Sequence, residues 1–374
     1  MALAVDIVIG DLRTGYTWKA SNVAGNVVIS FSSAAPTPTP VPSGTNFAVQ
    51  VGGTVSSYIL SFTGGTNTVD WGDGNISNSA AATIAHTYGS TGTNTVLIFG
   101  TCTKMTFPGN AFLKAIQSPM GGFPNLNSCA SLALSCSGLT NFYTGMLDGL
   151  TNITSLASAF QASGVKNIPD NAFWFDTNVT TYLQIFSQAT GLTNIGASAF
   201  RSGKVTTIQG GFYNIAALKR IPADLFYFTT NIATLGGASA GNGSFESTGI
   251  TDIPATLFAS NNTPTLVVQR MFAGTQSLTN IPAGLIDNHM NIQNAADLFR
   301  GDTNFLALPS TFAQGCSNLT SVANMFNGNI RMSGTAPSFW DTSLYPGIVG
   351  AGRTNCFKGC TNLSNYATID VNFK

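Results

Sequence analysis

Apolar and polar positions repeat with a long period through most of this chain. From about residue 130 to the C-terminus, an apolar anchor followed by a short turn and a phenylalanine recurs, as in residues 164–173, 191–200 and 249–258. The anchors are Ile168, Ile195, Ile221, Ile253, Ile281 and Leu308, in steps of 26 to 32 residues. A period of this size predicts a solenoid, in which each unit buries its apolar face only by stacking on its neighbours.

A second aromatic series runs at half this period. Its members are Phe160, Phe173, Phe186, Phe200, Phe212, Phe226, Phe245, Phe258, Phe272, Ile286, Phe299, Phe312 and Phe326. We expect these side chains to form the core of the solenoid. The one long step, from Phe226 to Phe245, contains a glycine-rich insertion at residues 236–243.

A row of polar residues directly precedes the anchor isoleucines. Neighbouring residues on a strand point to opposite faces, so buried isoleucines predict an outward row. The row comprises Asn167, Asn194, Arg220, Asp252 and Asn280. Neutral donors and acceptors of this kind suit hydroxyl-rich glycans, which makes the row a candidate ligand-binding surface. The alternative is that these side chains only solvate the face and form asparagine ladders.

The N-terminal part has a different organisation. Strand-like runs at residues 5–9 and 27–31 precede four prolines at alternate positions, which favour an extended spacer over residues 36–45. Residues 1–35 are therefore interpreted as a segment that anchors the chain to a partner or to other copies of itself. Residues 46–100 contain four strand-like runs separated by glycine turns, which predicts a small β-sandwich.

Two motifs in this sandwich segment are specific. Residues 69–74 read Val-Asp-Trp-Gly-Asp-Gly, and residues 86–88 read His-Thr-Tyr. With this spacing the segment resembles the PKD (polycystic kidney disease) domain. We expect Trp71 and Tyr88 to fill the core, while Gly72 and Gly74 permit the tight turn. Asp70 and Asp73 are expected to hydrogen-bond within the turn rather than to bind calcium, and His86 is interpreted as a structural histidine.

The repeats carry a second resemblance. Residues 357–363 read Phe-x-x-Cys-x-x-Leu, and residues 312–319 read Phe-Ala-Gln-Gly-Cys-Ser-Asn-Leu, which is the same pattern with one more residue between Phe and Cys. Over residues 101–374 the chain is similar to the BspA-like leucine-rich repeat family of bacterial surface proteins, although its period is longer and proline often follows the anchor isoleucine. The resemblance implies a leucine-rich-repeat-type solenoid with an adhesive role and no enzymatic activity. A C-terminal cap is expected from about residue 331.

Charge narrows the classes of function. Asp, Glu, Lys and Arg make up 8% of the chain, with net charge +0, against about 25% charged residues in typical soluble domains. The absence of a basic cluster argues against nucleic-acid binding. No stretch reaches the roughly 18 apolar residues that a membrane span needs. The N-terminus lacks an early basic residue and Asp6 interrupts its apolar run, so we expect no secretory signal.

The six cysteines do not form a disulfide or metal pattern. Cys129, Cys136, Cys316 and Cys360 each stand three residues before a leucine, so we interpret them as reduced thiols in one buried slot of the repeat. No metal or other cofactor is expected. With two histidines and one glutamate, catalytic residues are scarce, and the carboxylate pair Asp287 and Asp297 is retained only as a weak candidate for glycan cleavage.

Together these patterns predict a mainly β protein with short helices, a PKD-like sandwich followed by a leucine-rich-repeat-type solenoid. We expect a non-enzymatic structural or adhesive protein of a bacteriophage virion, such as a head fibre, a decoration protein or a tail-associated receptor-binding protein. It would contact capsid or tail proteins through residues 1–45, form a homo-oligomer and bind a host glycan or protein. The alternative is a bacterial cell-surface adhesin, and a glycan-degrading enzyme is a weaker third class.

Overall fold

The computed structural model describes residues 16–23, 26–33, 47–53, 57–80, 82–174 and 176–374. The chain divides into two compact units, Met1–Thr37 and Pro38–Lys374. In the first unit, β1 (Tyr16–Val23) and β2 (Asn26–Ser33) form an antiparallel hairpin. The expected strand at residues 5–9 and the proline-rich spacer at 36–45 lie outside the described residues.

The second unit begins with two antiparallel sheets, in the strand orders β10-β3-β8-β5-β6 and β7-β4-β9. The strands are β3 (Phe47–Gly53), β4 (Ser57–Thr63), β5 (Asn67–Asp70), β6 (Ile76–Ser79), β7 (Thr83–Thr87), β8 (Gly92–Gly100), β9 (Lys104–Thr106) and β10 (Leu113–Ile116). The four strands expected between residues 46 and 100 are present as β3, β4, β5 and β8. The sheets continue beyond residue 100, because β9 pairs with β4 and β10 pairs with β3.

Aromatic side chains from both sheets share one core. The rings of Tyr58 and Trp71 meet edge to face with centroids 5.9 Å apart, and the centroid of Phe107 lies 6.4 Å from that of Tyr58. Trp71 and Tyr88 are buried, as the sequence predicted. Gly72 has φ +74°, and a Cβ atom there would lie 2.3 Å from the carbonyl oxygen of Thr95, so the turn requires glycine.

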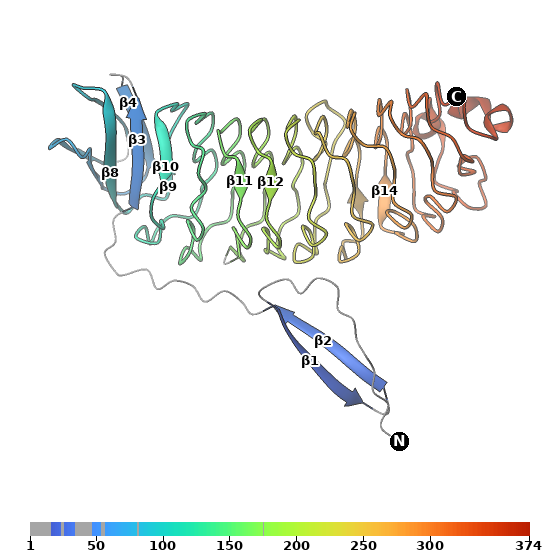
Figure 1. Cartoon of the computed structure of the whole chain (residues 1–374), viewed down its shortest axis with the longest axis horizontal. Helices are drawn as coiled ribbons and strands as arrows, with labels where there is room; N and C mark the ends of the chain where they lie inside the picture. Colours follow the sequence, from blue (N-terminus) through green and yellow to red (C-terminus); the bar gives the residue numbers. More distant parts are fainter. Residues whose placement is uncertain (1–15, 24–25, 34–46, 54–56, 81, 175) are drawn as a thin grey trace. The chain divides into compact units, whose positions relative to one another are not determined.

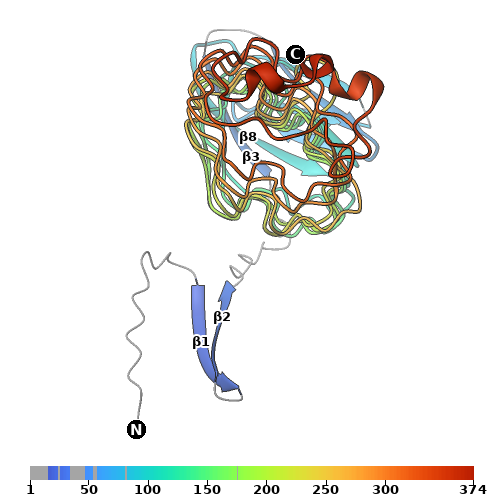
Figure 2. The ribbon, with the colours of Figure 1, turned by 90° about the vertical axis from the view of Figure 1, so that its right-hand side faces the viewer.

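From Lys104 onward the chain forms a succession of coils that lie side by side (Figure 1). Parallel bridges join residues about 27 positions apart, for example Ser128 to Ser155 and Ser155 to Thr181. Four strands are long enough to be named: β11 (Asn167–Ile168), β12 (Asn194–Ile195), β13 (Leu266–Val267) and β14 (Ile292–Asn294). Seen end-on, successive coils trace nearly the same outline (Figure 2), so each coil covers the open face of the one before.

One phenylalanine per coil forms a continuous column through the core. The rings are nearly parallel, with interplanar angles of 6° to 13° and centroids 5.2 to 6.1 Å apart. The column comprises Phe160, Phe186, Phe212, Phe245, Phe272, Phe299, Phe326 and Phe357. The remaining members of the predicted aromatic series are also buried, which confirms that the series forms the core.

Left-handed residues stand two positions before and after every ring of the column except Phe245, which has one only on its C-terminal side, at Ser247. Around Phe160, Ser158 has φ 54° and Ala162 has φ 53°. The backbone N–H groups of Ser158, Phe160 and Ala162 donate to carbonyls of the next coil, while the intervening N–H groups close tight turns within their own coil. A non-glycine residue in this region costs about 1 kcal/mol. The hydrogen bonds between coils offset that cost.

The expectation of short helices is wrong for the repeating units. The described residues contain no α-helix, and the left-handed positions replace helical continuation with successive turns. Three short 3-10 helices occur near the C-terminus: η1 (Gly350–Arg353), η2 (Tyr366–Thr368) and η3 (Val371–Phe373). The backbone N–H of Phe357 donates to the carbonyl of Phe373 at 2.7 Å, and the ring of Phe339 stacks on that of Phe357 with centroids 6.0 Å apart.

Replacing Phe212 by Ala should lower the free energy of unfolding by about 3–5 kcal/mol, because the ring is buried between Phe186 and Phe245. Urea unfolding followed by circular dichroism measures this change. Ile330→Ala, at a side chain that is 57% exposed, is the matched control and should cost less than about 1 kcal/mol. An equal decrease in the free energy of unfolding in the two variants would contradict the stabilising role of the phenylalanine column.

Candidate functional site

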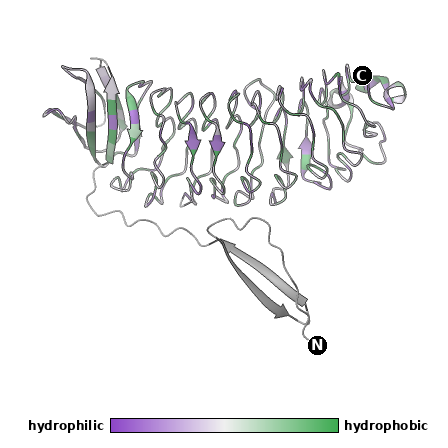
Figure 3. Ribbon diagram, in the orientation of Figure 1, coloured by the Kyte–Doolittle hydropathy of each residue, from purple (hydrophilic) through white to green (hydrophobic). Residues whose placement is uncertain are grey.

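The polar row predicted from the sequence lies on the surface. Asn167, Asn194, Arg220, Asp252 and Asn280 are all exposed, while the isoleucine that follows each of them is buried. The alternation of outward and inward side chains is therefore confirmed. In Figure 3 hydrophilic and hydrophobic residues accordingly alternate along the coils.

The structure places the members of this row in neighbouring coils. Asn167 pairs with Asn194 in β11 and β12, in parallel register. Further along, the backbone N–H of Thr251 donates to the carbonyl of Lys219 at 3.0 Å, which sets the coils of Arg220 and Asp252 side by side. Among the described residues no ion pair joins Arg220 to Asp252, so each can meet a ligand.

Asparagine ladders are present, but at other positions. These asparagines donate their side-chain amide to a carbonyl of the preceding coil at 2.6 to 3.4 Å. They are Asn152, Asn178, Asn231, Asn261, Asn304, Asn318 and Asn362. By contrast, the side chains of Asn167 and Asn194 have no hydrogen-bond partner within the described part of the chain. Their donors and acceptors are available to a ligand.

A longer bridged row, which we call the Ser/Thr ladder, was missed in the sequence. It runs through Lys104, Ser128, Ser155, Thr181, Thr207, Thr234, Val267, Asn294 and Ser321. Several of its hydroxyls accept a hydrogen bond from the backbone two residues on, as Ser155 does from Ala157 at 3.3 Å. The recurrence of Thr-Ser or Thr-Thr before a buried residue, as at 154–155, 180–181 and 206–207, was the signal that could have revealed it. These hydroxyls shape the following turn as well as facing outward.

The glycine-rich insertion at residues 236–243 is held by the only glutamate in the chain. Glu246 Oε2 accepts the backbone N–H groups of Gly241 and Gly243 at 3.0 and 3.1 Å, and Oε1 lies 2.5 Å from Nη2 of Arg270. Both side chains are mostly buried. The pKa of Arg270 is raised, chiefly by its hydrogen bond to Glu246. The insertion is thus an ordered loop folded around a charged pair.

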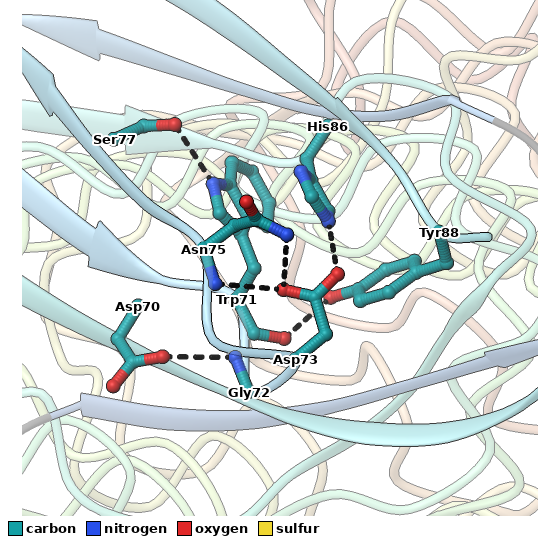
Figure 4. Close-up of polar contacts among 8 residues, drawn as sticks. All are labelled: Asp70, Trp71, Gly72, Asp73, Asn75, Ser77, His86 and Tyr88. Carbon is teal, nitrogen blue, oxygen red and sulfur yellow. Dashed lines mark hydrogen bonds and ion pairs between the residues drawn. The ribbon is translucent and has the colours of Figure 1, made fainter.

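The turn between β5 and β6 is satisfied internally (Figure 4). Asp70 accepts the N–H of Gly72 at 2.9 Å, and Asp73 contacts His86 Nε2 at 2.8 Å. Burial opposes ionisation of Asp73, but hydrogen bonds from His86 and Asn75 outweigh it and lower the pKa of the carboxyl. The imidazole of His86 stacks on Trp71 with centroids 4.8 Å apart. The expected structural roles of these carboxylates and of His86 are confirmed.

Asp287 and Asp297, the candidate carboxylates for glycan cleavage, form hydrogen bonds and an ion pair with neighbouring residues. Asp287 Oδ2 accepts the Thr311 hydroxyl at 2.8 Å and the N–H of Gly284 at 3.2 Å. Asp297 pairs with Arg300 at 3.2 Å. Among the described residues, no group of three or more His, Cys, Asp or Glu side chains is placed to hold a metal ion.

All six cysteines are buried and free. Burial raises the pKa of the Cys136 and Cys360 thiols to about 12, which keeps them protonated. Each donates its S–H to a carbonyl of the preceding coil, at 2.9 and 3.1 Å. The assignment of Cys129 and Cys316 to the same slot is wrong. Cys360 stands three residues after the column ring Phe357, whereas Cys316 stands four residues after Phe312 in the other half of its coil and donates its S–H to the carbonyl of Ile286. Cys129 follows the ladder residue Ser128, so its structural equivalents are Leu156 and Tyr182.

Arg270→Met should lower the free energy of unfolding by about 3 kcal/mol, because it leaves Glu246 buried without its partner. Arg300→Met is the matched control, since the Arg300 side chain is 51% exposed in its pair with Asp297; it should cost less than about 1 kcal/mol. Urea unfolding at neutral pH measures both. A loss at Arg270 no greater than at Arg300 would show that the insertion is not held by this pair.

Asp176→Asn should stabilise the protein at pH 7. Both carboxyl oxygens of Asp176 are buried without a hydrogen-bond partner in the described structure, and burial raises the pKa well above 3.8, with a further contribution from Asp148. A raised pKa means that the folded state binds the proton more tightly, so the wild type loses stability as the pH rises above about 4. The melting temperature of the variant should therefore exceed that of the wild type at pH 7, and the gap should shrink toward pH 3. A variant that melts lower at pH 7 would contradict this assignment.

No helix among the described residues is long and apolar enough to cross a membrane. In comparisons with known proteins, no family model, curated protein or solved structure matches the chain. What the surface can bind is therefore inferred from its own side chains.

Proposed function

We propose that the coils form a leucine-rich-repeat-type solenoid that follows a PKD-like β-sandwich. The parallel bridges at intervals of about 27 residues and the phenylalanine column support the solenoid. The two antiparallel sheets, with Trp71 in their core and the Asp73–His86 contact at the turn, support the sandwich. In this proposal β9 and β10 belong to the sandwich, which places its C-terminal boundary near residue 116 rather than at 100.

We infer that the protein is a non-enzymatic display protein of a bacteriophage virion: a head fibre, a decoration protein or a tail-associated receptor-binding protein. Residues 1–45 anchor it to capsid or tail proteins, it assembles as a homo-oligomer, and the coils bind a glycan or protein of the host surface. One observation carries this proposal: the coils hold Asn167, Asn194, Arg220 and Asp252 outward, with no side-chain partner among the described residues. A rigid row of free amides and charges suits a ligand with many hydroxyl groups.

The alternative is a bacterial cell-surface adhesin, which the resemblance of the repeats at residues 312–319 and 357–363 to the BspA-like family favours. Both functions use the same display surface. They differ in what residues 1–45 contact: a virion protein in one case and the cell envelope in the other.

The triple variant Asn194→Ala, Arg220→Ala, Asp252→Ala tests the display surface. It should fold normally, because all three side chains are exposed, and it should bind host cells or a glycan array at least tenfold more weakly than the wild type. The matched control alters three asparagines that clamp neighbouring coils, Asn152, Asn178 and Asn231, and should lower the melting temperature instead. Unchanged binding by a well-folded triple variant would exclude this row.

A chain beginning at Thr45 tests the anchor in the same assay. It should keep its ligand binding and fail to join the virion. Normal incorporation into particles would refute the anchoring role of residues 1–45, and attachment of the full chain to bacterial envelopes alone would favour the adhesin.

A further inference from the structure

Three successive coils bring an arginine between aromatic rings at one corner of the stack. Phe173 and Phe200 form a parallel bridge, so the residues that follow them, Trp174 and Arg201, are neighbours. The next coil places Tyr227 and Phe228 at the corresponding position, after Phe226. We call these four side chains the Arg201 corner.

The planar guanidinium of Arg201 stacks on the rings of Trp174 and Phe228. Its central carbon lies 4.0 Å from the ring centroid of Trp174 and 5.4 Å from that of Phe228. The indole of Trp174 is 3% exposed and meets Phe228 edge to face at 5.3 Å, so both supporting rings are fixed. Stacking occupies the faces of a guanidinium and leaves its edge N–H donors free.

No carboxylate among the described residues forms an ion pair with these donors. Within the described part of the chain Arg201 has neither an ion pair nor a hydrogen bond, and the carboxylate of Asp224 on the neighbouring coil accepts the Ser198 hydroxyl at 2.7 Å. Asp176, close to Trp174 in sequence, is buried, and burial raises the pKa of its carboxyl. Lys204, three residues after Arg201, carries a second positive charge, and its Nζ donates to the side-chain oxygen of Asn178 at 2.5 Å. A half-buried cation whose donors are unused by the described residues is a ready site for an anion.

An exposed ring packs against Phe228, one of the two rings that flank this cation. Tyr227 is 60% exposed, and its ring stands at 90° to that of Phe228 with centroids 4.9 Å apart. A rigid, amphipathic ring with an open face can pack against the C–H face of a sugar while its hydroxyl stays in water. The corner therefore offers both an anion contact and a stacking platform.

We propose that the Arg201 corner binds a saccharide that carries a carboxylate or a phosphate. The edge of the Arg201 guanidinium takes the anionic group in a bidentate pair, Lys204 contributes a second charge, and Tyr227 packs on the pyranose ring. The proposal rests on the display function above and names the ligand class for a site separate from the Asn167–Asn280 row.

Isothermal titration of the full chain with trigalacturonate, its methyl ester and glucose 6-phosphate tests this assignment. Trigalacturonate or glucose 6-phosphate should bind, and the uncharged ester should bind at least tenfold more weakly than the acid. Because the acid and the ester share the same sugar rings, equal affinities would overturn the anion contact. Failure of both charged ligands to bind would overturn the proposal.

Variants separate ligand contact from a structural role of the corner. Arg201→Gln and Tyr227→Ala should each weaken binding of the charged ligand at least tenfold, whereas Arg201→Lys, which keeps the charge but loses the fork, should lie between the wild type and Arg201→Gln. Arg300→Gln, at an exposed arginine elsewhere on the coils, is the matched control and should bind normally. If Arg201→Gln lowers the melting temperature, Tyr227→Ala still tests ligand contact, because the Tyr227 side chain is exposed and its loss should leave the fold intact. If Tyr227→Ala and Arg201→Lys both bind the charged ligand as tightly as the wild type, Tyr227 and the guanidinium of Arg201 do not contact it. Arg201 would then only join neighbouring coils.

The triple variant of the polar row distinguishes this inference from the proposed function. It should bind trigalacturonate or glucose 6-phosphate as the wild type does while binding host cells more weakly. If the row mutations weaken cell binding but the charged ligands do not bind, only the inference about Arg201 fails. If neither site affects any ligand, the display function fails as well.

Discussion

The stacked phenylalanine column is the constraint on which the rest of the coil architecture depends. Each coil must return its ring to within 5.2 to 6.1 Å of the previous one, nearly parallel to it. Loss of a ring leaves a cavity that both neighbouring coils line. The insertion at residues 236–243 obeys this constraint, because Phe212 and Phe245 still stack at 5.2 Å and 6°. The extra residues leave the column and are folded separately around Glu246.

The surface chemistry follows from the same stacking. Adjacent coils must satisfy their backbone groups with one another, and polar side chains assist: asparagines donate to carbonyls of the preceding coil, as Asn178 does to Thr151, and threonines such as Thr180 do the same through their hydroxyls. These neutral groups replace the charged side chains of an ordinary surface, which accounts for a content of 8% Asp, Glu, Lys and Arg. A charge repeated in every coil would stand close to its own copies and repel them. Where charges do occur, as at Arg201, Arg220 and Asp252, they interrupt a neutral surface and mark the positions most able to discriminate between ligands.

The proposed display function is consistent with how firmly the coils hold these side chains. A binding group is most effective when its side chain is held by the surrounding structure before the ligand arrives. β11 and β12 fix Asn167 and Asn194 in register, and two aromatic rings fix the plane of Arg201. The two surfaces differ in chemistry: the row offers neutral amides with two isolated charges, whereas the Arg201 corner offers a cation beside an open aromatic ring.

The sequence by itself determined the period, the burial of the phenylalanines and anchor isoleucines, and the outward direction of the residue before each anchor. Those properties depend on the spacing of apolar residues and on strand alternation, which are local. It also identified the turn at Trp71, because a tight turn with φ +74° at Gly72 requires a residue without a side chain. Only the tertiary structure decided the left-handed positions such as Ser158, the Ser/Thr ladder, the slot of Cys129 and the encounter of Trp174 with Arg201 and Phe228. Each of these depends on which residue of one coil faces which residue of the next, about 27 positions away, and that register is set by packing around the column.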